Sequence, residues 1–285
     1  MTDLAISVIL AEAARSLAPF TEDSALEAEI LLGFVLGKGR TYFRAYPDAP
    51  VSEAESSHFR GLVAHRSKGE PIAYLTGQRE FWSLDFEVNP SVLIPRHETE
   101  LLVESALALI ETGSGPTILD LGTGSGIIAI TLGLTRKDAK IMAVDASIAA
   151  LSVARRNADR LGSSNVEFFV SDWFTHIDKS IRFDLIVSNP PYIADNDPHL
   201  QKGDLRFEPR EALTSGPDGL EDIRTIANQA REFLLPSASL IMEHGYDQAD
   251  AVRRILIEAG YEGVGTRHDL QGHPRVTMAR YERAT

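Results

Sequence analysis

The chain of 285 residues contains no cysteine. This absence excludes disulfides and thiolate chemistry and is typical of proteins in a reducing cytosol, so we expect a cytoplasmic location. No apolar run reaches the roughly 18 residues that a membrane-spanning helix needs. The start also lacks the basic residue of a signal peptide, since Asp3 is acidic, and apolar residues from Leu4 to Leu17 repeat with helical spacing. A secreted or membrane-embedded protein is therefore not expected.

Basic residues are few. The 28 lysines and arginines face 41 aspartates and glutamates, which gives a formal net charge of -13. Proteins that work on duplex nucleic acid usually carry a basic surface, because contacts with phosphates supply most of their affinity. Stable nucleic-acid binding is therefore not expected. Hydrophobic residues make up 44% of the chain, enough for a sizeable core without a metal or a disulfide.

The sequence pattern divides the chain into three regions. Residues 1–70 are predicted to be helical, with a capping-box spacing at Ser24–Glu27 and a polar-rich helix over Ser52–Ser67. Residues 71–94 combine aromatic and β-branched residues with turn formers, which predicts a linking β-hairpin. Residues 95–285 alternate helices with short apolar strands.

In this third region the alternation predicts the fold. Strands are predicted to begin at Thr117, Lys140, Val166, Phe183 and Ala238, with two more near Gly263–Arg267 and Arg275–Tyr281. Helices are predicted over Glu98–Ile110, Ile127–Leu134, Ile148–Leu161, Leu220–Leu235 and Gln248–Ala259. Apolar strands separated by helices indicate an α/β fold with a mostly parallel sheet covered on both faces. The last two strands could form an antiparallel hairpin on the sheet edge.

A glycine-rich turn follows the first of these strands. The strand ends at Asp120, and the turn contains Gly122, Thr123, Gly124, Ser125 and Gly126. Glycines let the backbone approach a ligand closely, and the following helix presents free N–H groups. A dinucleotide fingerprint would need glycine at position 127, where this chain has Ile127. The turn indicates a ligand at the carboxyl end of the strand, although a purely structural turn has the same pattern.

The next two strands also end in candidate ligand residues. Asp145 stands about 20 residues past the glycines, where a carboxylate can accept both hydroxyls of a ribose. Its alternative role is to cap the following helix, which Ser147 can already do. After the third strand, Asp172 could accept an adenine amino proton and Trp173 could stack on the base. A turn aspartate and a core tryptophan explain these two residues equally well.

The fourth strand ends in Asn189, Pro190, Pro191 and Tyr192. The prolines cannot donate to a sheet, so the chain leaves the strand with a stiff backbone. The side-chain oxygen of Asn189 and the carbonyl of Pro190 can hold the two N–H bonds of an –NH2 group, while Tyr192 packs flat against a planar acceptor. Such a grip favours methyl transfer to an amide nitrogen, a poor nucleophile that gains from being held in line with the methyl group. All four residues are candidates for substrate binding, and Asn189, Pro190 and Tyr192 for catalysis.

These motifs together resemble the peptide-chain release factor glutamine methyltransferases. The resemblance runs from about Pro71 to the end, and its motifs are PIAYLTGQREFWSLDFEV, LIPRHETE, DLGTGSG, SDWF, SNPPYI, RFEPREAL and RVTMARY. It implies a class I methyltransferase domain at 95–285, Rossmann-like with a mostly parallel seven-stranded sheet. It also implies a small helical domain at 1–70 and a linking hairpin at 71–94. S-adenosylmethionine is the implied methyl donor, and N5 of the glutamine in the release factors' Gly-Gly-Gln loop is the implied acceptor.

Carried onto this chain, the resemblance implies a role for each motif. The turn from Gly122 to Gly126 would line the methionine part of the cofactor, Asp145 would hold the ribose and Trp173 would flank the adenine. Asn189 to Tyr192 would grip the glutamine, with Asn189 also close to the cofactor. Asp120 and Asp172 complete the candidate cofactor-binding residues. His97 stands where the family usually has proline, and we expect it to be a surface residue without a catalytic role.

Three alternatives remain open at this point. A nucleic-acid amino-methyltransferase would present the same planar –NH2 to this loop, but the acidic charge counts against it. A ribosomal-protein glutamine methyltransferase would share the chemistry and differ in its partner. A binding module could keep the fold without catalysis. Because residues 1–70 carry none of the chemistry identified, we expect them to dock a folded protein substrate.

Overall fold

The structure is a computed structural model that describes residues 4–111 and 113–282. The chain forms two compact units. The first consists of Met1–Gln78 and Gln201–Phe207, and the second of Arg79–Leu200 and Glu208–Thr285. Among the described residues, no helix combines the length and the apolar character that crossing a membrane requires.

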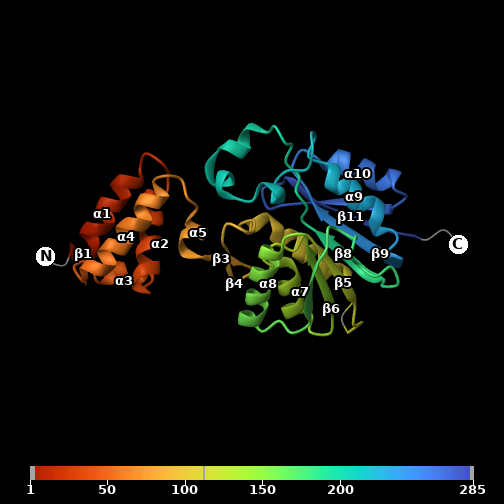
Figure 1. The fold of residues 1–285 in the computed structure, drawn as a ribbon, viewed down its shortest axis with the longest axis horizontal. Coiled ribbons are helices and arrows are strands. Elements are labelled where there is room, and N and C mark those ends of the chain that lie inside the picture. The colour runs from red at the N-terminus through yellow and green to blue at the C-terminus, as the bar shows by residue number, and fades with distance from the viewer. Residues whose placement is uncertain (1–3, 112, 283–285) are drawn as a thin grey trace. The chain divides into compact units, whose positions relative to one another are not determined.

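The first unit is helical, as predicted (Figure 1). Its elements are β1 (Leu4–Ala5), α1 (Ile6–Leu17), α2 (Ser24–Leu36), α3 (Arg40–Ala45), β2 (Pro50–Val51), α4 (Glu53–Arg66) and α5 (Ile72–Thr76). Apolar residues at helical spacing form its core, for example Ile6, Ile9 and Ala13 of α1 against Leu31 and Leu32 of α2. The burial of this apolar stripe stabilises helices that would be marginal in isolation.

The capping box predicted at Ser24–Glu27 is wrong. Ser24 is already the first residue of α2, and Glu27 accepts two hydrogen bonds of 2.8 Å from the guanidinium of Arg66 on α4. The spacing of Ser24 and Glu27 fits a capping box, but in the folded unit the Glu27 carboxylate binds the guanidinium of Arg66 and not the backbone at the helix start. The capping box that does form joins Ser52 and Glu55 at the start of α4.

A short segment that follows the fourth predicted strand also belongs to the first unit. It includes the 3-10 helix η3 (Gly203–Phe207). Asp204 of this helix lies 3.3 Å from the guanidinium of Arg66. Two carboxylates therefore surround Arg66, and hydrogen bonding from Glu27, followed by the charges of Glu27 and Asp204, raises its pKa despite burial. The segment thus packs with the helices through charge as well as through shape.

The hairpin predicted over 71–94 is shorter in the structure. The region contains helix α5 and then the paired strands β3 (Gln78–Phe81) and β4 (Leu84–Glu87). Pro71 occupies the N-cap of α5, and Gly77 ends it in the left-handed conformation. These are strong helix-end signals, and they outweigh the aromatic and turn-forming residues on which the strand prediction rested.

The second unit is built on a seven-stranded sheet with the strand order β10-β11-β9-β8-β5-β6-β7. The strands are β5 (Thr117–Leu121), β6 (Lys140–Asp145), β7 (Val166–Val170), β8 (Phe183–Ser188), β9 (Leu234–Glu243), β10 (Glu262–His268) and β11 (Pro274–Arg280). Strands β5 to β9 pair in parallel, and β11 pairs antiparallel with both β9 and β10. The predicted α/β fold, with a mostly parallel sheet and an antiparallel edge hairpin, is confirmed.

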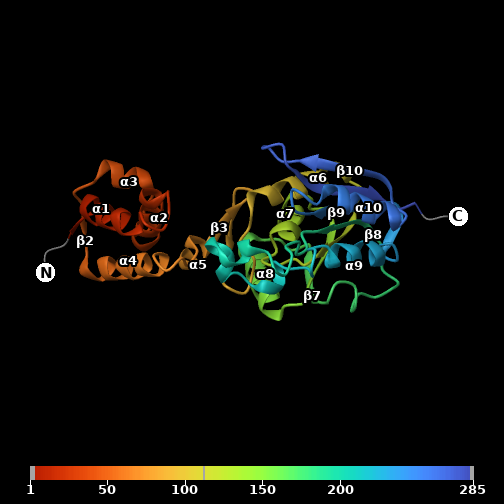
Figure 2. The same cartoon turned by 90° about the horizontal axis from the view of Figure 1, so that it is seen from above.

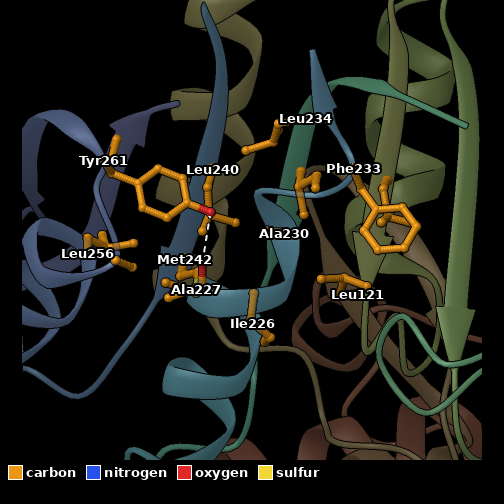
Figure 3. Close-up of a cluster of buried hydrophobic side chains, with 14 of the residues drawn as sticks. Leu121, Ile226, Ala227, Ala230, Phe233, Leu234, Leu240, Met242, Leu256 and Tyr261 are labelled. Atoms are coloured by element: carbon orange, nitrogen blue, oxygen red, sulfur yellow. Dashed lines mark hydrogen bonds between the residues drawn. The ribbon is translucent and has the colours of Figure 1, made fainter. Parts of the chain in front are cut away.

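Helices cover both faces of this sheet (Figures 1 and 2). They are α6 (Glu100–Leu109), α7 (Ile127–Thr135), α8 (Ile148–Leu161), α9 (Glu221–Ala230) and α10 (Ala249–Glu258). The 3-10 helices η1 (His97–Thr99), η2 (Pro198–Gln201) and η4 (Arg210–Ala212) lie in the connecting segments. Successive strand residues point to opposite faces. Leu119 and Leu121 accordingly pack in the core that α9 and α10 complete, and Ile118 packs in the core with α6 and α7. Figure 3 shows the first core, where the Tyr261 phenol donates to the carbonyl of Ala227 at 3.0 Å.

One boundary differs clearly from the sequence prediction. Helix α9 ends at Ala230 where Leu235 was predicted, and β9 begins at Leu234 where Ala238 was predicted. Leu234 pairs with Phe183 of β8, and a register shift follows. Pairing with a neighbouring strand therefore decides the state of residues that locally resemble the end of a helix.

Candidate active site

A cavity of about 510 Å³ lies at the carboxyl ends of the parallel strands. The chain runs from β5 to β6 and β7 on one side and returns to β8 on the other side of β5, so the strand order reverses there. Such reversals form the crevices where α/β sheets bind ligands. The predicted site residues that line the cavity are Gly122, Gly124, Asp145, Asp172, Trp173, Asn189 and Pro191. The fold therefore brings together residues from four strand ends.

The glycine turn lies against the indole of Trp173. Gly122 has φ 70°, and a side-chain carbon added there would lie 3.4 Å from the Trp173 ring. A side chain at position 122 would contact the ring, and the positive φ would strain the backbone of any residue other than glycine. The Trp173 indole N–H donates to Asp222 at 3.1 Å. The turn and the ring thus form one wall of the cavity.

Several residues predicted to bind the cofactor lie behind this wall. The described cavity lining does not include Asp120, Thr123, Ser125 or Gly126. Asp120 is fully buried and accepts from the Thr123 hydroxyl at 2.6 Å and from the backbone N–H of Ala129 at 3.2 Å. Burial raises the pKa of Asp120 to about 7. These contacts join the turn to the start of α7, so Asp120 is placed to shape the turn.

Asp145 is held by the backbone of the same turn. One carboxylate oxygen accepts from the N–H of Gly124 at 2.8 Å, and the other accepts from the N–H of Ser147 at 2.8 Å. Ser147 caps α8 by accepting from Ala150, as predicted. Burial raises the pKa of Asp145, and the two backbone bonds oppose that rise. A carboxylate has about four acceptor positions, so capacity remains for ligand hydroxyls on the cavity side.

The segment Asn189–Tyr192, called the acceptor loop below, leaves β8 next to the glycine turn. Asn189 lines the cavity, and its side-chain Nδ2 donates to the Thr99 hydroxyl at 3.2 Å. The carbonyl of Tyr192 accepts from Gln248 at 2.9 Å. It also lies so close to Gly219 that a side-chain carbon there would meet it at 2.3 Å. The hydrogen bond from Gln248 and the close packing of Gly219 therefore both hold the loop backbone at Tyr192.

Pro190 and Tyr192 are not in the described lining of the cavity. Pro190 is buried, but it is adjacent in the chain to Asn189, which lines the cavity. Burial raises the pKa of the Tyr192 phenol, and the charge of Glu243 raises it further. The nearby cations Arg275 and Arg96 act in the opposite direction. The expectation that the ring packs flat against the acceptor stays a prediction.

Two carboxylates that the sequence prediction missed border the same region. Asp222 holds the Trp173 indole and lines the cavity. Glu208 has a fully buried side chain that pairs with Arg96 and accepts from the N–H of Ile94 at 3.0 Å. The motifs LIPRHETE and RFEPREAL contain this pair, but their separation of 112 residues hides it. His97 is a surface residue, as expected, with its side chain 63% exposed.

The comparisons with known proteins agree along nearly the whole chain. Residues 9–77 match the family described as the PrmC N-terminal domain, and residues 97–208 match the methyltransferase small domain. A protein named release factor glutamine methyltransferase from Burkholderia pseudomallei is 50% identical, with 90% of this chain and 92% of that protein covered. A protein of the same name from Escherichia coli strain K12 is 46% identical over 92% and 94% of the two chains.

The fold itself is similar to solved structures of other methyltransferases. A crystal structure of a methyltransferase from Pyrococcus furiosus has a TM-score of 0.54 at 18% identity and covers 80% of this chain and 100% of its own. A Thermus thermophilus 16S rRNA methyltransferase in complex with AdoMet and guanosine has a TM-score of 0.52, also at 18% identity, over 72% and 50% of the chains. At this identity the likeness establishes the fold alone.

Proposed function

Because this chain belongs to the family of release factor glutamine methyltransferases, we propose that it methylates the side-chain amide nitrogen, N5, of the glutamine in the Gly-Gly-Gln motif of peptide-chain release factors. S-adenosylmethionine is the methyl donor. One observation of geometry supports this function best: Asn189 and Pro191 share a single cavity with Gly124 and Asp145. Residues suited to binding an amide and residues suited to binding a nucleoside thus line the same cavity.

The cavity fits the cofactor in size and chemistry. Its volume of about 510 Å³ lies within the range of small-molecule sites. Asp145 offers acceptor positions for ribose hydroxyls, and Trp173 offers an aromatic face. Gly124 adds no side chain, and an added carbon there would meet nothing within 4 Å. When bound, S-adenosylmethionine supplies an electrophilic methyl group on a sulfonium.

Replacing Asp145 with alanine is expected to weaken S-adenosylmethionine binding by about tenfold or more. Charged hydrogen bonds contribute ~1.5–3 kcal/mol each, and about 1.4 kcal/mol corresponds to a tenfold change. Titration calorimetry measures the dissociation constant. The matched control is Asp184→Ala, because Asp184 also accepts from a backbone N–H, that of Thr117 at 2.8 Å, but at the opposite end of the sheet. Equal affinities for the two variants would remove Asp145 from the ribose role.

The acceptor loop prepares the glutamine amide. The Asn189 side-chain oxygen and the Pro190 carbonyl accept the two N–H bonds of the amide, which keeps its nitrogen lone pair in line with the methyl group. Preventing rotation of the amide removes a large part of the entropic barrier. The amide proton leaves after the methyl group has arrived, so the loop needs no strong base.

The first unit is proposed to dock the release factor. Helix α2 is apolar on two sides: Leu31 and Leu32 are buried, while Leu26, Ile30 and Phe34 are 37%, 39% and 43% exposed. Residues four apart lie on one face of a helix, so the exposed three form a continuous stripe. A folded protein substrate can bury this stripe and supply binding energy remote from the glutamine. The net charge of -13 suits a partner with basic surface.

The double variant Ile30→Ser/Phe34→Ser is expected to raise KM for an intact release factor about tenfold, with kcat and cofactor affinity unchanged. Two exposed apolar side chains leave the interface while the cavity is untouched. Steady-state kinetics with labelled cofactor separates KM from kcat. Ile257→Ser is the control, because Ile257 is an exposed apolar residue of α10, at 56%. An unchanged KM in the double variant would place the docking surface elsewhere.

The proposed function is tested by offering labelled cofactor and the protein to purified release factor, ribosomes and DNA, and mapping the modified peptide by mass spectrometry. We expect one methyl group on the glutamine of the Gly-Gly-Gln motif, and no labelling of a release factor in which this glutamine is alanine. Label in a ribosomal protein would favour the ribosomal-protein alternative. Label in DNA would favour the nucleic-acid alternative.

A further inference from the structure

Glu243 is a buried carboxyl group beneath the acceptor loop, and the chemistry above does not use it. It ends β9, and its side chain is 1% exposed. Strands β8 and β9 run in parallel with Ser188 opposite Met242. The next residues of the two strands, Asn189 and Glu243, therefore lie side by side at this edge, where Glu243 still pairs with Val276 of β11. Glu243 is not among the described residues that line the cavity, so it reaches the substrate only through a neighbour.

Thr99 is one such neighbour, and Asn189 itself, whose amide also lowers the pKa of Glu243, is another. Thr99 belongs to η1 and is 1% exposed. Its hydroxyl accepts from Nδ2 of Asn189 at 3.2 Å and lowers the pKa of Glu243, so it lies close to that carboxyl group. Because a hydroxyl has one proton, Thr99 can accept from Asn189 and donate to Glu243 at the same time. The three side chains therefore form a polar cluster that reaches the cavity at Asn189.

We infer that Glu243 and Thr99 are positioning residues that fix the amide of Asn189 with its oxygen toward the substrate. An ionised carboxylate can only accept, so Thr99 must donate to Glu243 and accept from Asn189. The Asn189 nitrogen then faces inward, and the amide oxygen is left for the glutamine N–H. This inference rests on the proposed role of Asn189 and extends it to residues that do not touch the substrate.

The same polar cluster predicts what happens when Glu243 gains a proton. A neutral carboxyl can donate to Thr99, and the Thr99 proton is then free for the oxygen of Asn189. The Asn189 amide can then rotate by 180°. Its –NH2 group would face the –NH2 group of the substrate, so that two donors meet and no hydrogen bond forms. Glu243 has the features that permit this change: its Oε2 is buried without a hydrogen-bond partner among the described residues, and burial raises its pKa to about 7.

Polar and charged groups around Glu243 determine whether its carboxyl group is ionised or neutral. The hydroxyl of Thr99 and the positive charge of Arg275 on β11 favour the ionised form, and Glu98 of η1 opposes it. The amide of Asn189 also favours the ionised form, and the Tyr192 phenol is close enough for its own pKa to rise with the charge of Glu243. Methyl transfer should therefore rise with pH through about 7 as Glu243 ionises.

The test uses the full chain with saturating cofactor and release factor. Glu243→Gln keeps the shape but can donate to Thr99 at every pH, so we expect kcat to fall about tenfold and the rise near pH 7 to disappear. Thr99→Val should lower kcat similarly, and Thr99→Ser should restore it because the hydroxyl returns. Cofactor affinity should stay unchanged in all three. Thr131→Val is the control, since the Thr131 hydroxyl on α7 is buried without a partner in the described part of the chain.

The outcomes separate this inference from the proposed function. If Glu243→Gln and Thr99→Val both keep the wild-type kcat and pH profile while Asn189→Ala loses activity, the positioning role is wrong and the acceptor loop stands. If Thr99→Ser fails to restore kcat, the hydroxyl is not the link. If Asn189→Ala itself retains full activity, the proposed role of the acceptor loop fails first.

Discussion

Replacing Asn189 with alanine is expected to lower kcat for glutamine methylation by about a hundredfold or more, with cofactor affinity nearly unchanged. In the proposed mechanism the Asn189 oxygen accepts from the amide N–H, and this interaction strengthens as the nitrogen gains positive charge during methyl transfer. Losing one such positioned polar group typically costs about 10²–10³ in rate. Single-turnover kinetics with saturating release factor measures the chemical step directly, and calorimetry measures the cofactor dissociation constant.

The control for this variant is Asn165→Ala. Asn165 also anchors a loop, because its Nδ2 donates to the carbonyls of Arg136 and Ala139 at 3.0 Å each, and it lies outside the described lining of the cavity. Its loss should affect stability and leave kcat close to wild type. If Asn189→Ala raises KM for the release factor with kcat intact, Asn189 contributes uniform binding and the transition-state role is wrong.

Replacing Arg96 with alanine is expected to lower the free energy of unfolding by about 3–5 kcal/mol, the usual cost of leaving a buried charge without its partner. Glu208, the partner, has a side chain with 0% exposure, whereas that of Arg96 is 30% exposed. The loss should also weaken cofactor binding, because the segments on either side of this pair supply Val92 and Pro209 to the cavity wall. Urea denaturation followed by circular dichroism gives the change in stability.

Two further variants show whether the buried charge is the cause. Arg156→Ala removes a surface pair with Glu87, in which the side chains are 48% and 35% exposed, and should cost less than about 1 kcal/mol. The double variant Arg96→Met/Glu208→Gln keeps an acceptor for the N–H of Ile94 but removes the charge, so it should recover much of the lost stability. Equal costs for Arg96→Ala and Arg156→Ala would contradict the argument.

Local sequence information was sufficient for much of the fold and for part of the site. The parallel strands are short and mostly apolar, and polar or turn-forming residues follow them: Gly122 follows Thr117–Leu121, Ser171 and Asp172 follow Val166–Val170, and Asn189 and two prolines follow Phe183–Ser188. In a parallel sheet the carboxyl ends of neighbouring strands meet at one edge. The strand ends alone therefore predict that Asp145, Trp173 and Asn189 lie together, and all three line the cavity.

Partners far apart in the chain decided the rest. Glu27 forms no capping box, because its carboxylate binds Arg66 of another helix. Asp120 accepts from the Thr123 hydroxyl behind the turn and lies outside the described lining of the cavity. A sequence motif names a residue type at a position, but the direction of its side chain depends on what packs against it.

The sequence by itself thus determined the α/β order, the glycine turn and the acceptor loop, since each depends on residues within a few positions of one another. Only the tertiary structure decided that Glu208 would receive Arg96 and that Thr99 and Glu243 would lie beneath Asn189. Burial and hydrogen-bond partners are properties of the assembled core. The sequence alone does not distinguish Glu243 from other glutamates. Its proposed positioning role arises because the fold buries the carboxylate away from water and leaves only a few polar side chains for it to interact with.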